Sequence, residues 1–231
     1  MNSDTHYDLI LKNGKVVLPE GTAEVNIGIK NEKIQEIGSL ANTSAEEIID
    51  CKNLHVLPGV IDSQVHFREP GLENKENLES GMMAAAFGGV TAVFEMPNTN
   101  PLTITPETIT DKLTRASRAA WTDYAFYLGG TGKTGPNLTN WENAPGICGI
   151  KIFMGASTGD LLSASDEEIE SVLSHGKRVV AVHAEDQYIM EENKEIILGD
   201  SNDVSLHNEW RSPESCLSAT TRLVNIAKKY G

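Results

Sequence analysis

The sequence predicts an α/β fold in which a parallel sheet follows a small unit of short strands. After residue 58, short apolar runs alternate with segments of helical character. This repeated alternation is typical of parallel strands joined by right-handed crossovers. Residues 7–57 instead form short runs broken by turn residues. We therefore expect two domains, a β unit over residues 1–57 and an α/β part over residues 58–231.

Turn residues divide the expected β unit. Asn13-Gly14 stands between two apolar runs, a pattern typical of a tight β-hairpin. Residues 25–29 alternate apolar and polar side chains, Asn31-Glu32 forms a turn, and residues 33–37 alternate again. A sheet of so few strands cannot bury both of its faces. We therefore expect this unit to pack on another part of the protein.

The α/β part contains five expected strands, separated by helical segments. We expect strands at 56–66 (buried), 90–96, 124–128, 147–154 and 178–184, and helices at 77–87, 107–120, 166–175, 187–198 and 213–230. Thr105 before Pro106, and Ser165 three residues before Glu168, are start signals for two of these helices. A closed eight-stranded barrel needs about 250 residues. Five strands therefore predict either an open sheet or part of a barrel.

Composition and charge exclude several classes of function. The net charge is −14, whereas a nucleic-acid-binding surface needs a basic footprint. No apolar run approaches the roughly 20 residues of a membrane span, and the first residues lack the features of a signal peptide. The three cysteines are far apart, which favours reduced thiols. We expect a cytoplasmic protein that binds neither nucleic acid nor membrane.

Polar side chains stand at or near the ends of the expected strands. His66 and Arg68 follow the first strand, and Asn98 follows the second. Lys151 lies inside the fourth strand, and His183 lies near the end of the fifth. Because the carboxyl ends of parallel strands share one face of the sheet, these residues can converge on one site.

Four of these residues, all except Lys151, also have a simple structural interpretation. A single histidine in a strand is more often a hydrogen-bonded core residue than a ligand. Asn98, between two prolines, is most simply a turn residue. Arg68 could form a surface ion pair with Glu69, and its functional alternative is a two-pronged grip on a substrate carboxylate.

Lys151 is harder to explain structurally, although barrel interiors do hold structural lysines. It stands between Ile150 and Ile152, so its ammonium group is buried at a cost unless it is paired. A buried lysine loses its proton readily. The neutral amine can react with carbon dioxide to give a carbamate, which can bridge two metal ions.

Together these motifs resemble the dihydroorotase branch of the amidohydrolase superfamily. The matching stretches are residues 58–62, 66–71, 88–91, 96–101, 151–155 and 183–186. The Arg-Glu-Pro-Gly and Pro-Asn-Thr motifs are fairly specific to dihydroorotases, whereas hydantoinases and allantoinases share the lysine segment. The resemblance implies a metal-dependent (β/α)8 TIM barrel, incomplete in this chain. Residues 1–57 would be part of an N-terminal β-sandwich, and residues 58–231 the N-terminal part of the barrel.

The resemblance also implies a reaction and a site. Such enzymes interconvert dihydroorotate and N-carbamoyl-aspartate in pyrimidine synthesis, using two zinc ions and a zinc-activated hydroxide. By resemblance, His66 binds the inner zinc, carboxylated Lys151 bridges both zincs and His183 binds the outer one. Arg68 and Asn98 would hold the carboxylate of a small acidic substrate. The resemblance further implies a homodimer, with aspartate carbamoyltransferase as a candidate partner.

The chain departs from the family pattern in two places. Where the family has His-x-His, this chain has Gln64 two residues before His66, and an amide oxygen is a weaker zinc ligand than an imidazole nitrogen. The family also carries a further zinc histidine and a catalytic aspartate on later strands, expected beyond residue 231. His207 and Arg211 are expected to be surface residues only.

Three hypotheses follow from these motifs and departures. The first is a dihydroorotase represented by its N-terminal portion, which we expect to be inactive by itself. The second is a non-catalytic dihydroorotase-like scaffold, which Gln64 favours. The third is a hydantoinase- or allantoinase-type enzyme, which Arg68 disfavours because an acidic substrate explains that residue best.

Overall fold

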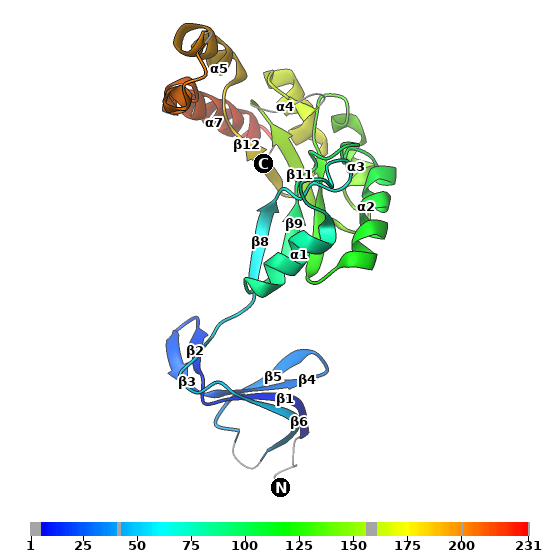
Figure 1. The fold of residues 1–231 in the computed structure, drawn as a ribbon. Coiled ribbons are helices and arrows are strands. Elements are labelled where there is room, and N and C mark those ends of the chain that lie inside the picture. Colours follow the sequence, from blue (N-terminus) through cyan, green and yellow to red (C-terminus); the bar gives the residue numbers. More distant parts are fainter. Residues whose placement is uncertain (1–5, 41–42, 156–160, 200, 231) are drawn as a thin grey trace. The chain divides into compact units, whose positions relative to one another are not determined.

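The chain folds into two compact units, Met1–Gly59 and Val60–Gly231. The computed structural model describes residues 6–40, 43–155, 161–199 and 201–230. Figure 1 shows short strands in the first unit, and alternating strands and helices in the second. Among the described residues, no helix combines the length and the apolar character needed to cross a membrane.

The first unit contains two small sheets. One has the strand order β5-β4-β1-β6 and the other the order β3-β2-β7. Their strands are β1 (His6–Lys12), β2 (Lys15–Leu18), β3 (Gly21–Glu24), β4 (Asn26–Lys30), β5 (Lys33–Gly38), β6 (Ser44–Asp50) and β7 (His55–Val56). Tyr7 and Ile10 of β1 are fully buried and, with Leu40, form a small core. The Tyr7 hydroxyl donates a 2.8 Å hydrogen bond to Glu36 at the edge of this core.

One expected hairpin of this unit is wrong and the other is confirmed. β1 and β2 do not pair, because they belong to different sheets. The backbone N–H of Asn13 instead donates to the side chain of Asn26 (3.1 Å), which directs the chain from one sheet to the other. β4 and β5 do form an antiparallel hairpin. Asn31 and Glu32 between them have φ values of 51° and 61°, as a two-residue hairpin turn requires.

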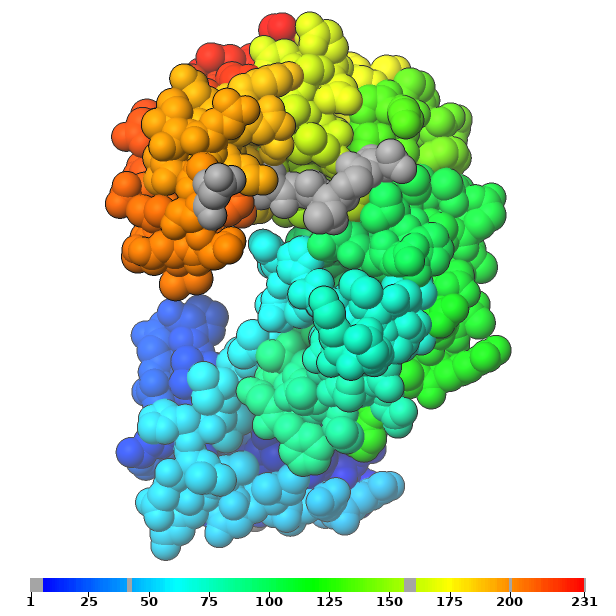
Figure 2. Space-filling model, turned by 45° about the horizontal axis from the view of Figure 1, so that its top comes forward, coloured from blue at the N-terminus to red at the C-terminus, as the bar shows by residue number. Residues whose placement is uncertain are grey.

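The second unit is built on five parallel strands in the order β12-β11-β10-β9-β8. The strands are β8 (Val60–Val65), β9 (Val90–Glu95), β10 (Asp123–Gly129), β11 (Ile147–Phe153) and β12 (Val180–His183). Helices connect them, and Figure 2 shows this unit, from cyan to red, curling around an open side. A curled parallel sheet with its helices fits an incomplete TIM barrel. The main core lies between the sheet and the helices, where Leu128, Ile150 and Ile152 are fully buried.

The helices begin and end close to the positions that the sequence predicts. They are α1 (Leu78–Phe87), α2 (Pro106–Ala119), α4 (Asp166–His175), α5 (Gln187–Asn193) and α7 (Pro213–Ala227), with short turns α3 (Leu138–Trp141) and α6 (His207–Trp210) that were not expected. Thr105 and Ser165 cap α2 and α4, as predicted, each in a reciprocal capping box. The helix expected over 187–198 continues beyond α5 as a wider turn, Lys194–Leu198.

The apolar run expected as one buried strand at 56–66 is divided between the two units. Val56 ends β7 and pairs with β2, whereas β8 starts at Val60 and pairs with β9. Pro58-Gly59 between them belongs to neither strand, and proline has no N–H to donate to a ladder. β8 is also an edge strand, with Val60 55% and Ile61 60% exposed. The expectation of a buried strand is therefore wrong here.

The three cysteines are free thiols.

Candidate functional site

The register of the sheet brings the predicted lysine and the second predicted histidine to the same face. Lys151 of β11 aligns with Ala181 of β12, and Phe153 aligns with His183. Side chains along a strand alternate between the two faces of the sheet. Lys151, Phe153 and His183 therefore lie on the inner face, opposite the residues that pack against the helices.

His66 lies directly after β8 and is bonded to the loop that follows β9. Its Nδ1 is 2.8 Å from the Asn98 Oδ1, which is an acceptor, so Nδ1 carries the proton and Nε2 has the free lone pair. Burial lowers the pKa of His66 more than this hydrogen bond raises it, and the positive charge of Arg68 lowers it further. These effects favour the neutral form of the ring, which lies within electrostatic reach of the other predicted residues.

Lys151 is 3% exposed and has an unusual environment for a lysine. Its Nζ lies 5.0 Å from the centre of the Phe153 ring. No residue that the structure describes accepts a hydrogen bond from this amine or forms an ion pair with it. Burial lowers the pKa of Lys151, which favours the neutral amine.

His183 at the end of β12 is surrounded by a ring and two charged side chains. It stacks on Phe153, with ring centres 6.2 Å apart, and its Nε2 is hydrogen-bonded to Glu185. Glu185 in turn accepts both a 2.9 Å hydrogen bond from Arg211 Nε and a second bond from its Nη2. Burial raises the pKa of Glu185, but the bonds from Arg211 and His183 outweigh it, so the pKa is lowered and the group is a carboxylate.

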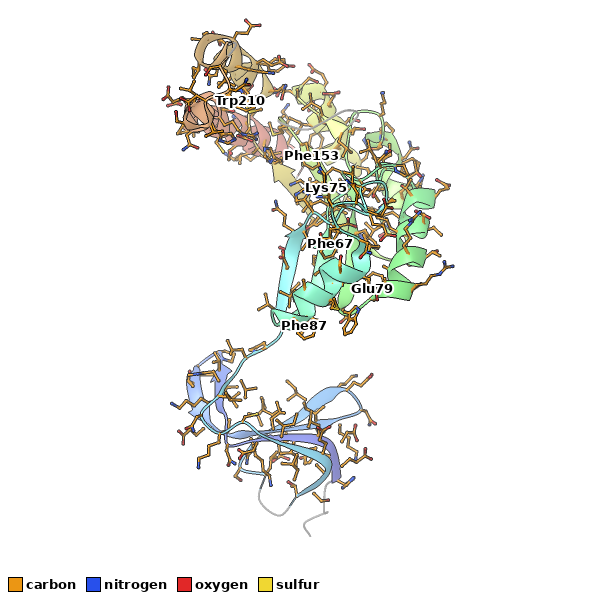
Figure 3. All side chains as sticks on the ribbon, viewed as in Figure 1. Phe67, Lys75, Glu79, Phe87, Phe153 and Trp210 are labelled. Carbon is orange, nitrogen blue, oxygen red and sulfur yellow. The ribbon has the colours of Figure 1, made fainter. Side chains whose placement is uncertain are left out.

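Arg211 is therefore a residue that the sequence interpretation missed. It was expected at the surface, but its side chain is 22% exposed and bound to Glu185. Its guanidinium also lies 5.6 Å from the centre of the Trp210 ring, which is labelled in Figure 3. The only feature of the sequence that could have indicated a role for Arg211 is its position directly after Trp210 in a polar segment. His207, by contrast, is exposed as expected.

Arg68 does not form the surface ion pair that was its structural alternative. Glu69 is bonded instead to Arg115 (3.2 Å) and to the backbone N–H of Leu78 (3.0 Å). Arg68 is half-buried, and no described residue accepts a hydrogen bond from its guanidinium. The group is thus available to an anion beside His66.

Gln64 lies on the same strand face as Asp62, but its side chain is exposed. Its backbone N–H donates to Asp62 Oδ1 (3.0 Å). Within the described ranges, no three His, Cys, Asp or Glu side chains converge closely enough to hold a metal ion. The zinc site that the sequence predicts would therefore require carboxylation of Lys151. With it, His66 Nε2, the carbamate oxygens and a nitrogen of His183 would be donors of the kind that zinc prefers.

The loops after β8 and β9 are joined beside this site. The backbone N–H of Asn100 donates to the carbonyl of Pro70 (2.9 Å), and the peptide bonds preceding Pro70 and Pro101 are cis. Gly71 has a φ of 98°, and a Cβ there would collide with Asn100. Only glycine fits both the backbone angle and this contact.

We expect Gly71→Ala to lower the free energy of unfolding by about 2–4 kcal/mol, since left-handed strain adds to a backbone collision. Gly89→Ala is the matched control, because Gly89 has a φ of 85° and nothing lies within 4 Å of an added Cβ. Urea unfolding of both variants isolates the collision. Equal losses would show that Asn100 moves aside without cost.

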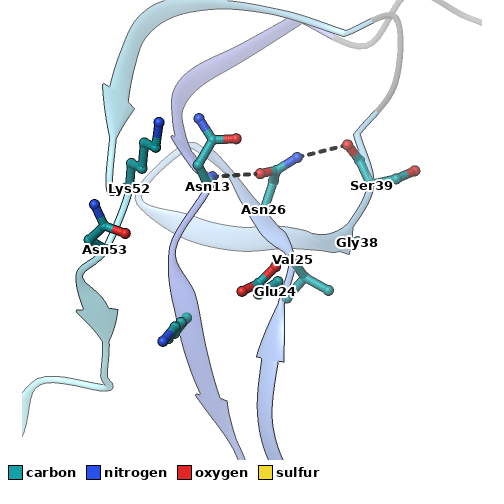
Figure 4. Close-up of a pocket in the computed structure, with 9 residues that line it drawn as sticks. Asn13, Glu24, Val25, Asn26, Gly38, Ser39, Lys52 and Asn53 are labelled. Carbon is teal, nitrogen blue, oxygen red and sulfur yellow. Dashed lines mark hydrogen bonds between the residues drawn. The ribbon is translucent and has the colours of Figure 1, made fainter.

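A separate polar cavity of about 620 Å³ lies in the first unit (Figure 4). The Asn26 amide, which accepts from Asn13 N–H, also donates to the Ser39 carbonyl (2.8 Å) across it. These bonds join the ends of β1, β4 and β5, which belong to one sheet. The cavity is thus explained by the packing of its own unit.

Comparison with known proteins supports the family that the motifs indicate. Residues 54–141 match the family model described as Dihydro-orotase-like. The dihydroorotase of Thermococcus kodakarensis is 36% identical over 226 residues, which cover 96% of this chain and 48% of that protein. An allantoinase of Desulfitobacterium hafniense is 32% identical over 236 residues, which cover 98% of this chain and 52% of that protein.

Solved structures give the same picture. The L-hydantoinase (dihydropyrimidinase) of Arthrobacter aurescens superimposes with a TM-score of 0.91 at 28% identity, covering 97% of this chain and 51% of that one. This chain thus spans about half the length of the relatives it matches. The similarity extends across both units. The family model and the relatives together support a dihydroorotase/amidohydrolase N-terminal portion over most of this chain.

Proposed function

We propose that this chain carries part of the active site of a zinc-dependent cyclic amidohydrolase of the dihydroorotase type. The reaction is the reversible hydrolysis of the cyclic amide of dihydroorotate to N-carbamoyl-aspartate. The observation that carries the proposal is the amine of Lys151, buried on the inner face of the sheet without a polar partner among the described residues. Such an amine is costly unless it is modified or binds a ligand.

The donors of this chain have distinct roles in the proposed site. His66 through Nε2, carboxylated Lys151 and His183 would hold zinc, which supplies a hydroxide nucleophile and polarises the amide carbonyl. Arg68 would bind the substrate carboxylate. Because Asn98 Oδ1 is bonded to His66, its amide nitrogen is the donor left for the same carboxylate.

A hydantoinase- or allantoinase-type substrate is the second candidate. Relatives with those names match at 28–32% identity, close to the 36% of the dihydroorotase. Arg68 separates the candidates, since its unpaired guanidinium suits a ring that carries a carboxylate. The third candidate is a non-catalytic scaffold, which Gln64 favours and which the zinc measurements below test.

Zinc binding tests the proposal on the chain itself. We expect equilibrium dialysis with metal analysis to detect bound Zn²⁺, and His66→Ala and Lys151→Ala to lose it. His55→Ala is the control, because this histidine is exposed and belongs to the first unit. Absence of binding, or equal binding by all variants, would contradict the proposed metal site.

Substrate choice can be measured in a complex. This chain is mixed with the part of the Thermococcus kodakarensis dihydroorotase that lies outside the region matching this chain. We expect zinc-dependent hydrolysis of dihydroorotate by the complex and none by the 231-residue chain alone. Arg68→Met should lower kcat/KM for dihydroorotate about 100-fold, because a charge-assisted contact of roughly 3 kcal/mol is lost. An equal loss of kcat/KM for hydantoin, which has no carboxylate, would refute the proposal that Arg68 binds the substrate carboxylate.

Gln64→His should increase the affinity for Zn²⁺ by at least tenfold, about 1.4 kcal/mol. The replacement places an imidazole two residues before His66, which restores the His-x-His spacing that the resemblance implies. Competition with a chelator of known affinity measures the change. Gln64→Asn is the matched control, because it keeps an amide, and equal affinities for all three proteins would show that position 64 does not reach the metal.

A further inference from the structure

We propose that Glu185 and Arg211 are positioning residues that fix the ring of His183 with its proton on Nε2, so that Nδ1 is the nitrogen presented to the metal. This inference deepens the proposed function and rests on it for the role of Nδ1. It assigns a function to the segment before α7, which the sequence alone placed at the surface.

The tautomer follows from the donors and acceptors around His183. The Glu185 carboxylate only accepts hydrogen bonds, so the bond between it and His183 Nε2 requires the proton on that nitrogen. Arg211 Nη2 lies 3.4 Å from the same nitrogen, but it also only donates, so the two groups do not bond to each other and both donate to Glu185. The ring therefore donates to Glu185 through Nε2, which leaves Nδ1 as the nitrogen that can bind a metal.

Arg211 in turn fixes the carboxylate. Its guanidinium grips both oxygens of Glu185, a planar two-pronged arrangement that holds orientation better than a single contact. Stacking on Trp210 restrains the guanidinium from its other side. Trp210 is anchored by a 2.9 Å hydrogen bond from its indole N–H to the carbonyl of Met190 in α5.

On the opposite side of the imidazole, Phe153 stacks on the ring at 6.2 Å. The ring is therefore held in its plane by Phe153 and in its rotation by Glu185. A metal ligand gains affinity when its other ring nitrogen donates to a carboxylate, and losing such a partner costs about 10–100-fold in metal affinity.

The tautomer can be read directly by long-range ¹H–¹⁵N NMR of the metal-free, ¹⁵N-labelled chain, with His183→Gln used to assign the signal. We expect an Nε2–H ring with an unprotonated Nδ1 in the unaltered protein. A ring with its proton on Nδ1, or an even mixture, would overturn the inference. This reading needs no metal and no turnover, so it does not depend on the success of the proposed function.

Variants then test the two positioning residues. Glu185→Gln should give a mixture of tautomers and a 10–100-fold loss of Zn²⁺ affinity. Arg211→Met should give a smaller loss, and Arg211→Lys should restore it only partly because lysine lacks the planar fork. Glu170→Gln, a surface carboxylate on α4, is the control. An unchanged tautomer and unchanged Zn²⁺ affinity in folded Glu185→Gln would refute the positioning role.

Discussion

Replacing Lys112 with methionine is expected to lower the free energy of unfolding by about 3–5 kcal/mol at pH 8. Lys112 of α2 is 1% exposed, and its Nζ donates to Glu95 of β9 at 2.9 Å. The same ammonium donates to the Met96 carbonyl (3.3 Å) and lies 5.3 Å from the centre of the Phe126 ring. Its removal leaves the Glu95 carboxylate buried without a compensating charge.

The loss should depend on pH because Glu95 titrates near neutrality. Burial raises the pKa of Glu95 from 4.5 to about 7, although the ammonium of Lys112 opposes the shift. A raised folded pKa means that this group's contribution to stability is complete below pH 4.5 and is lost as the pH rises through 7. At pH 5 the carboxyl is protonated, so Lys112→Met should cost less than half as much as at pH 8.

Burial lowers the pKa of Lys112, and Glu95 only partly restores it. Both members of the pair are thus disfavoured in their charged forms, and one oxygen of Glu95 has no hydrogen-bond partner. We expect the double variant Glu95→Gln with Lys112→Met to recover most of the loss, as replacement of a whole buried pair often does.

Urea unfolding at pH 5 and pH 8 measures these effects. All three tryptophans (Trp121, Trp141 and Trp210) lie in the second unit, so their fluorescence reports on the unit that contains the pair. Lys229→Met is the control, since Lys229 pairs with Glu170 at the surface and its loss should leave the unfolding midpoint unchanged. A pH-independent loss for Lys112→Met would exclude Glu95 as its cause.

The sequence predicts the helices and most strands of the second unit because local signals agree with the packing. Thr105 and Ser165 mark their helix starts through side-chain caps, which need only local residues. The hairpin expected at Asn13 fails because the pairing of β1 with β6 is decided by residues more than thirty positions away. The prediction that β8 is buried fails because an edge strand can have the same apolar sequence as a central strand.

The predicted site has the same limit. His66, Lys151 and His183 stand out in sequence because each is a polar residue at or near a strand end. Glu185 and Arg211 do not stand out, because their pairing spans 26 residues and depends on how the chain returns before α7. Glu95 and Lys112 likewise have the sequence of ordinary surface charges, and only the packing of α2 on β9 buries them.

Glu142→Ala is expected to lower the free energy of unfolding by about 2–4 kcal/mol. Glu142 follows α3 and is 2% exposed. Its carboxylate accepts from the backbone N–H groups of Lys177 (2.9 and 3.0 Å) and Arg178 (3.0 Å), which lead into β12. Two bonds to a charged acceptor are lost, at about 1–2 kcal/mol each.

The matched variant Glu142→Gln keeps one carbonyl oxygen and should lose about half as much. Because β12 ends at His183, loosening its start should also broaden the NMR signal of that ring, whereas Gly89→Ala should not. Urea unfolding followed by the fluorescence of neighbouring Trp141 measures stability, and ¹⁵N NMR measures the ring. A stable Glu142→Ala protein with an unaltered His183 signal would show that β12 is held by its pairing with β11 alone.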